Sequence, residues 1–323
     1  DMSWMFGRTL FNKYIGNWNT ANVLTTQAMF WSATTFNNES LPLSGWNTSK
    51  VITMRSMFNT AQQFNQNINT NSSNWVTSAV TDMQFMFNEA TSFNNGESSG
   101  LSNYPLTGWD TGNVTTMYSM FYIADSFNQN ISTWNTAKVV TMSDMFQGAG
   151  LFNQNVGNWN VSGVTDMQQM FTFALSFNNG GSTSISGWNV SNVTTMFQMF
   201  AGTPFNQPLT NWDTLKLTGS SSLQQTFYSA TSFNQDISTN GNYWNLSGAT
   251  SLNQTFYLAS LFNANISNWD VRKVSNFNGT FYSATSFNQN LGSWIITGGT
   301  SISLNDFLSY SNLSQDNYDS TLI

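Results

Sequence analysis

The residue types that carry most enzyme chemistry are missing from this chain or widely spaced in it. There is no His and no Cys among the 323 residues, so the chain can form neither a nucleophile activated by His nor a zinc site of the usual ligand types. A pair of carboxylates could still hydrolyse a glycosidic bond. The 15 Asp and Glu residues do not gather in the sequence, however. We therefore expect no enzymatic activity.

The carboxylates that recur at fixed places have a structural interpretation. Asp82 and Asp166 stand where a helix would start, and Asp110, Asp213 and Asp270 each follow a Trp where Asn stands in other repeats. Asp and Asn side chains cap helices and turns by accepting backbone N–H groups. No calcium loop of the DxDxDG type occurs, so we expect no cofactor. A calcium site of backbone and Asn oxygens in an insertion loop stays open as an alternative.

The composition favours a neutral surface rich in hydrogen-bonding groups. Hydrophobic residues make up 40% of the chain and charged residues only 7%, and the net charge is −7. The eight Lys and Arg residues are scattered, so there is no basic stripe to neutralise phosphates or anionic lipid. No apolar run reaches the roughly 18 residues that span a bilayer. We expect neither nucleic-acid binding nor direct membrane insertion.

Three aromatic residues recur in the same order along nearly the whole chain, and we call each set of equivalent residues a column. The elements that carry these columns must position any functional residue. A first Phe, usually after Met, is followed by a second Phe with Asn after it and then by a Trp. The distance from Trp to the next first Phe is 12 residues in nine of eleven cases, whereas 7 to 16 residues separate the second Phe from its Trp. Length changes confined to one segment are typical of a solenoid, whose coils must return to register. The first-Phe column is Phe6, Phe30, Phe58, Phe87, Phe121, Phe146, Phe171, Phe200, Phe227, Phe256, Phe281 and Phe307.

Each repeat offers one short helical pattern and one short strand pattern. Residues 164–174 place apolar side chains three and four positions apart, which predicts a short helix. The segments 152–156 and 233–237 are short and bounded by polar residues, which predicts a brief strand that pairs with its copies in neighbouring coils. The fold class we expect is an α/β repeat solenoid of about eleven coils of a roughly 25-residue repeat, each with a short helix and one or two short strands.

The Asn after each second Phe forms a column of its own. If the coils stack, these amides would form a ladder that satisfies backbone groups at a turn. We interpret the column as structural rather than ligand-binding. The ladder residues that we single out are Asn65, Asn128, Asn153, Asn234 and Asn288.

The unit WNVSGVTDMQQMFTFALSFNN, at 159–179, resembles the BspA-like bacterial surface-protein repeat. This repeat is a relative of the leucine-rich repeat and is also found in mycoplasma-type lipoproteins. The resemblance covers nearly the whole chain and implies a leucine-rich-repeat-like solenoid, export, and a role in adhesion or surface architecture. It implies no catalytic residue. The chain is then expected to be one repeat domain over 1–323, a piece of a longer surface protein, with a capping segment at 301–323.

The residue after each first Phe varies between polar and apolar types, which suggests an exposed column. In three consecutive repeats it is Tyr228, Tyr257 and Tyr282. A strip of tyrosines offers an amphipathic surface to a sugar or a protein, although the rings could instead only cover their neighbours.

Two classes of function follow from these observations. The first is an extracellular structural or adhesive protein at the cell surface, whose solenoid is a spacer and a binding surface. Its partners would be other surface proteins or glycans, and it could associate with itself into a larger assembly. The second is a module that binds or processes carbohydrate. A glycan array distinguishes them, because a spacer binds nothing and a lectin binds a narrow set of sugars.

Overall fold

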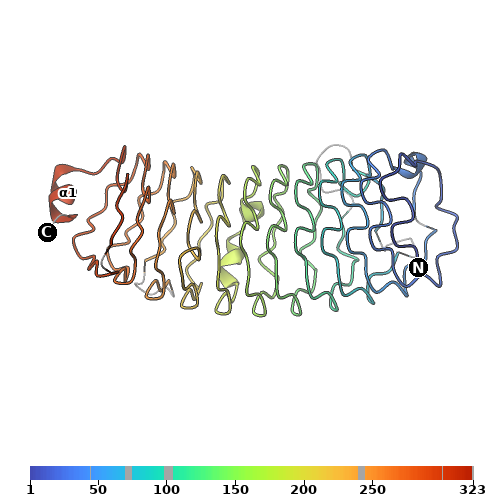
Figure 1. Cartoon of the computed structure of the whole chain (residues 1–323), viewed down its shortest axis with the longest axis horizontal. Helices are drawn as coiled ribbons and strands as arrows, with labels where there is room; N and C mark the ends of the chain where they lie inside the picture. The colour runs from blue at the N-terminus through green and yellow to red at the C-terminus, as the bar shows by residue number, and fades with distance from the viewer. Residues whose placement is uncertain (44, 70–74, 98–104, 239–243, 300, 322–323) are drawn as a thin grey trace.

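The chain forms a row of coils that lie side by side along one long axis, with the two termini at opposite ends (Figure 1). This computed structural model describes residues 1–323 except 44, 70–74, 98–104, 239–243, 300 and 322–323. Helices are short in the described part: the 3-10 helices η1 (Asn38–Ser40), η2 (Asn179–Gly181) and η3 (Thr183–Gly187), and the α-helix α1 (Gln315–Thr321). Within that part, no helix has the length and apolar character to cross a membrane.

The segment 164–174 is a run of turns, so the helix expected there is wrong. The backbone N–H groups alternate in direction: Met170 donates to the carbonyl three residues before it, whereas Phe171 donates to a carbonyl of the next coil (N–O distance 3.0 Å). Gln169 and Phe173 both have a φ of 53°, which a right-handed helix does not accommodate. A spiral of turns also brings an apolar residue inward every three or four positions. The spacing alone therefore does not distinguish it from a helix.

Backbone bridges between coils are isolated and parallel, and they lie outside the segments in which the sequence predicts strands. Most of them join residues that stand five positions before the first Phe, such as Thr141 and Asp166, whereas the bridge between Gly219 and Ala249 lies earlier in its coils. The segments 152–156 and 233–237 carry no bridge of this kind. Those segments are connected to neighbouring coils by hydrogen bonds from backbone N–H groups to Asn side chains. The column of bridges in the first part of the chain is Thr25, Thr53, Asp82, Thr116, Thr141, Asp166 and Thr195.

One repeat with three extra residues, within 215–227, interrupts the bridges but not the hydrogen bonds at the Phe column. The bridges stop at Thr195 and resume at Gly219. In the same region Phe200 donates its N–H to Thr226 (3.0 Å), and Phe227 donates its N–H to the next coil (3.0 Å). The additional residues are therefore accommodated beside the stack, and neighbouring coils remain in register.

The core is one continuous cluster that runs from Ile15 to Leu291. Within a coil the two Phe rings stack face to face, as in Phe30 and Phe36 (centroid distance 3.8 Å), and Phe30 lies 5.5 Å from the first Phe of the next coil. Indole N–H groups of the Trp column also form hydrogen bonds between neighbouring coils. Trp134, for example, donates to the carbonyl of Leu106 in the preceding coil (3.0 Å). Each coil thus buries its aromatic side chains only against its neighbours, as in other repeat proteins.

The last coil shifts the Phe column by one residue. In the coil before, Phe256 donates its N–H to the carbonyl of Thr280 (2.9 Å), the residue that directly precedes the first Phe, Phe281. Phe281 in turn donates its N–H to the carbonyl of Phe307 (2.9 Å), so Phe307 is equivalent to Thr280. Leu308 therefore occupies the first-Phe position, and the assignment of Phe307 to that column is wrong. The ring of Phe307 meets that of Phe281 edge-on rather than stacked, at 61°.

The helix α1 lies at the C-terminal end of the stack, within the segment 301–323 (Figure 1). Ser314 donates its backbone N–H to the Oδ1 of Asn288 (2.8 Å), and Asn317 donates its side-chain amide to the backbone carbonyl of Asn288 (2.9 Å). Ser314 thus stands where another Asn would stand, but it has no amide to continue the column. The segment closes this side of the last coil.

Candidate functional site

The Asn after each second Phe connects its coil to the next one. Its side-chain Oδ1 accepts the backbone N–H of the equivalent Asn one coil further along, at distances of 2.8 to 3.0 Å. We call this column the Asn ladder. Each bond joins the side chain of one coil to the backbone of the next. These bonds connect neighbouring coils here, as backbone bridges do five positions before the first Phe. All five residues singled out from the sequence lie in it: Asn65, Asn128, Asn153, Asn234 and Asn288.

A Gln beside the Asn ladder uses the remaining acceptor capacity of the Asn. The amide of Gln154 donates to both the backbone carbonyl and the Oδ1 of Asn128 (2.9 Å each). Gln235 bonds Asn206 in the same way (3.1 and 2.9 Å). An Oδ1 that already accepts two N–H groups has little left for a ligand. The geometry of the Asn ladder is therefore that of a structural element.

In three coils with an insertion loop, a second, buried Asn replaces this Gln. Asn38, Asn95 and Asn179 each accept the backbone N–H of an apolar residue in the preceding coil at 2.8 to 2.9 Å. The side-chain oxygens of these three residues are thus turned toward the stack rather than into the loops. Over the described ranges, no group of three or more acidic, His or Cys side chains is placed to hold a metal ion.

The recurring carboxylates cap turns. Asp82 accepts the N–H of Gln84 (2.9 Å) and Asp166 that of Gln168 (3.0 Å), two residues further on in each case. Asp110, Asp213 and Asp270 make the same bond at 2.9 to 3.2 Å. Burial raises the pKa of Asp166, and the bond from Gln168 opposes this shift. The capping role predicted for these residues is retained, but the capped element is a turn and not a helix.

The three tyrosines stack on one another. Tyr228 and Tyr257 have ring centroids 5.0 Å apart at 4°, and Tyr257 and Tyr282 lie 4.6 Å apart at 6°. All three are half-buried. Burial is the main cause that raises the pKa of Tyr257, and the neighbouring Tyr282 and Tyr228 add to this shift. Both faces of the middle ring are covered by tyrosines. The strip therefore presents ring edges and hydroxyls rather than the flat faces on which a sugar stacks.

The column that contains these tyrosines is less exposed than the sequence suggests. Thr172 and Ala201 in the same column are each only 1% exposed. The next residue along the chain has a positive φ in both coils. After Thr172 this residue is Phe173, which is 50% exposed. The left-handed residue is thus the one that projects, which a pattern of residue types does not reveal.

A second amide column was not anticipated from the sequence. Gln169, Gln198 and Gln225 each donate a side-chain N–H to the Oε1 of the next Gln, which is Gln254 for the last of them, at 2.9, 2.8 and 2.6 Å. All four have a positive φ. The recurrence of Gln two positions before the first Phe is the signal in the sequence that points to this column. Such chains of amides stabilise a stack and leave few free donors.

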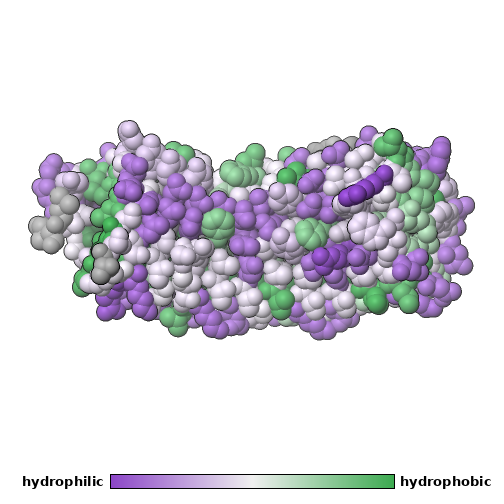
Figure 2. Space-filling model, in the orientation of Figure 1, coloured by the Kyte–Doolittle hydropathy of each residue, from purple (hydrophilic) through white to green (hydrophobic). Residues whose placement is uncertain are grey.

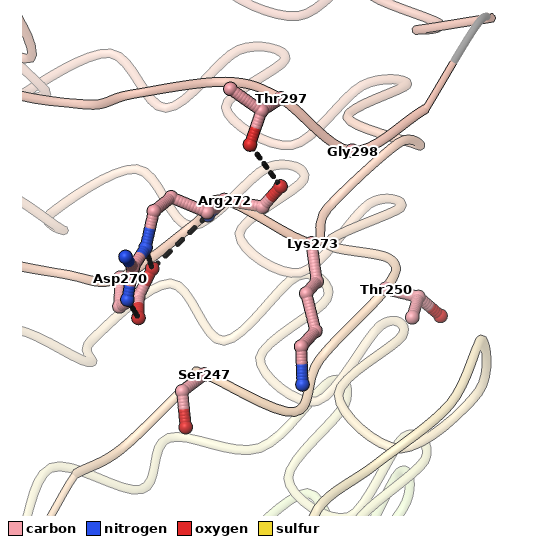
Figure 3. Close-up of a pocket in the computed structure, with 7 residues that line it drawn as sticks. All are labelled: Ser247, Thr250, Asp270, Arg272, Lys273, Thr297 and Gly298. Atoms are coloured by element: carbon pink, nitrogen blue, oxygen red, sulfur yellow. Dashed lines mark hydrogen bonds and ion pairs between the residues drawn. The ribbon is translucent and has the colours of Figure 1, made fainter.

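A cavity of about 700 Å³ lies near the C-terminal end of the stack. Three neighbouring coils line it, through Ser247 and Thr250, through Asp270, Arg272 and Lys273, and through Thr297 and Gly298 (Figure 3). Arg272 holds Asp270 through two of its three donor nitrogens, from Nε to Oδ1 at 2.8 Å and from Nη2 to Oδ2 at 2.6 Å. This pairing is the main cause that lowers the pKa of Asp270. The ammonium group of Lys273 extends toward the segment that carries Ser247 and Thr250 (Figure 3).

Lys273 belongs to a column four residues after each Trp in which Asn, Lys and a small residue alternate. Three of its lysines donate to the Oδ1 of an Asn in the preceding coil at 2.5 to 2.8 Å: Lys50 to Asn22, Lys138 to Asn113 and Lys216 to Asn192. The coil before Lys273 has Gly248 in the place of that Asn. Among the described residues Lys273 has no hydrogen bond or ion pair within 4.0 Å; it lies near enough to Asp270 only to lower the pKa of that carboxyl slightly.

Most of the remaining surface is polar. On the face shown in Figure 2, hydrophobic residues form separate spots over the coils, with larger groups near both ends.

Of the charged residues that line the cavity, Asp270 was interpreted from the sequence only as a cap, and neither Arg272 nor Lys273 was singled out. The available signal was Lys273 itself, which follows Gly248 where the regular order of the column would place an Asn.

The comparisons with known proteins agree with the repeats. Neither the curated proteins nor the solved structures contain a match to this chain. A family model described as "Mycoplasma protein of unknown function, DUF285" matches residues 1–100, 97–183, 182–243 and 223–318 in tandem. Because these matches cover nearly all of the sequence, the chain belongs to this family of repeat-containing proteins.

Proposed function

We propose that this chain is an extracellular scaffold at a cell surface, a leucine-rich-repeat-like solenoid that serves as a spacer and as a binding surface in adhesion. The observation that carries the proposal is that the Asn, Gln and Trp side chains that recur in the repeats form hydrogen bonds from coil to coil. The Asn ladder, the Gln column and the indole N–H groups all serve stability. Variation is left to the outer positions, which is how repeat proteins diversify their binding.

The BspA-like resemblance supports the same proposal, because such repeats belong to exported surface proteins. The neutral surface, with 7% charged residues, suits contact with uncharged and hydrated partners such as glycans. The uniform stack also suits association with further copies or with other surface proteins.

A second candidate function is the binding of carbohydrate, which the cavity beside Lys273 favours. Its lining is made of hydroxyl groups and charged groups, with a single carboxylate in Asp270. Hydrolysis of a glycosidic bond requires two carboxyl groups on either side of the bond. The cavity therefore supports binding rather than processing.

The location is tested on intact source cells with an antibody raised against the chain. We expect the antibody to label unpermeabilised cells, and brief protease treatment of intact cells to remove the signal. Labelling that requires permeabilisation would contradict the proposal. Beads coated with the purified chain should in addition adhere to host cells or to glycans, and beads that never adhere would reduce the chain to a spacer.

A further inference from the structure

We propose that the cavity beside Lys273 binds the anionic group of an acidic saccharide, with the ammonium of Lys273 as the charged partner. This inference rests on the proposed function, because it names the class of ligand that such a surface would recognise. It comes from a comparison of equivalent positions within the chain itself.

The first step is that the ammonium groups of equivalent lysines already donate a hydrogen bond to a side chain of the preceding coil. Lys138 and Lys216 lie one coil after an Asn, and each donates to the Oδ1 of that Asn at 2.7 and 2.5 Å. Gly248 removes this acceptor in the coil before Lys273. An ammonium group has three donors and no acceptor, so Lys273 retains its capacity for an external acceptor.

The second step concerns charge. Arg272 and Asp270 neutralise each other through a two-fold hydrogen bond, so the charge of Lys273 is left as the excess on the cavity wall. The whole chain carries a net charge of −7. A positive cavity on a negative molecule selects a ligand with a localised anion and discriminates against polyanions, which the rest of the surface repels.

The third step concerns the rest of the ligand. The hydroxyl groups of Ser247, Thr250 and Thr297 line the same cavity, and they match the many hydroxyl groups of a sugar. A second hollow of about 260 Å³ shares Asp270 and Arg272 with the first and is bordered by Ile295, which is 63% exposed. A ligand longer than one sugar unit could thus lie across the ion pair and cover an apolar side chain. An acidic peptide would find little apolar surface to anchor it here, so the saccharide is the better match.

The test uses the full chain and a tetrasaccharide with a single uronic-acid unit, with its carboxyl-reduced neutral counterpart as the matched ligand. Calorimetry should show binding of the acidic saccharide and at least tenfold weaker binding of the reduced one. Lys273→Gln should weaken binding of the acidic saccharide at least tenfold. Gly248→Asn keeps Lys273 but restores the Asn partner seen at Lys216, and we expect a comparable loss. Lys216→Gln is the control and should bind like the wild type.

Equal binding of the acidic and the reduced saccharide, or unchanged binding by both Lys273→Gln and Gly248→Asn, would overturn the proposal. Melting curves show whether Gly248→Asn is folded, and Lys273→Gln provides the test if it is not. A tetrasaccharide with a single sulfate in place of the carboxylate distinguishes the two anionic groups, and binding of a Glu-rich peptide alone would overturn the saccharide class. Antibody labelling of intact cells is independent of this result, so the failure of the anion site and the failure of the surface role are distinguishable.

Discussion

At the scale of single residues, the stability of the stack depends on which of two adjacent aromatic side chains points inward. Phe171 is fully buried and stacks on Phe177 at 3.7 Å, whereas Phe173 in the same coil is 50% exposed. Phe171→Ala should lower the free energy of unfolding by about 3–5 kcal/mol, as for other buried Phe residues. Phe173→Ala is the matched control and should change it by less than about 1 kcal/mol. Denaturant unfolding measures both, and equal losses would contradict the assigned orientations.

Asp144 makes stability depend on pH. Burial raises the pKa of this carboxyl, a hydrogen bond from Ser143 opposes the shift, and the charge of Asp166 adds to it. Because the folded-state pKa lies above the unfolded-state value, the favourable contribution is present at low pH and is lost as the pH rises through the folded-state pKa. Asp144→Asn should therefore raise the melting temperature at pH 7 and change it little at pH 3. An equal gain at both pH values would show that the carboxylate charge is not the cause.

At the scale of the repeated elements, the Asn ladder should matter more than any single surface contact. The Oδ1 of Asn153 accepts the N–H groups of Asn178 and Gly180 at 2.8 and 2.9 Å. Asn153→Ala leaves both donors without this acceptor, which should cost about 1–3 kcal/mol for each donor that stays buried. Asn153→Asp keeps an acceptor oxygen and should cost less. Thermal unfolding compares the two, and equal losses would mean that the bond contributes nothing.

The tyrosine strip belongs to the same scale. Because Tyr257 is covered on both faces by Tyr228 and Tyr282, we expect the triple replacement by Ser to lower stability by about 0.5–1.5 kcal/mol for each stacked pair beyond the lost burial. Binding to glycans should not change. A glycan array that loses its hits with this triple variant would instead identify the strip as a binding surface.

How much of this architecture the sequence predicts depends on whether a feature repeats. The columns of Phe171 and Trp134 and the Asn ladder follow from spacing, because each coil repeats the same contacts. The helix expected over 164–174 does not follow, since Gln169 and Phe173 take left-handed conformations that residue types do not specify. The candidate site does not follow either. It depends on one departure from a regular column: Lys273 follows Gly248, whereas the three other lysines follow an Asn to which they donate.

At the scale of the whole molecule, the account requires one uninterrupted set of hydrogen bonds from coil to coil. The first-Phe N–H groups provide it: those of Phe58, Phe146, Phe227 and Phe281 donate to the next coil at 2.9 to 3.0 Å. The repeat with three additional residues is the place where such a series would most easily break, because the bridges are interrupted there. A scaffold that presents its surface as one unit needs continuity through that repeat.

Residue-resolved amide hydrogen exchange tests this continuity most directly. Opening one coil of a continuous stack exposes the faces of its neighbours, so the first-Phe amides in the middle of the chain should exchange at similarly slow rates. We predict that the amides of Phe200 and Phe227, on either side of the additional residues, are as well protected as those of Phe146 and Phe171. Fast exchange at Phe200 and Phe227 between two slowly exchanging blocks would contradict the account, because the chain would then consist of two separate stacks.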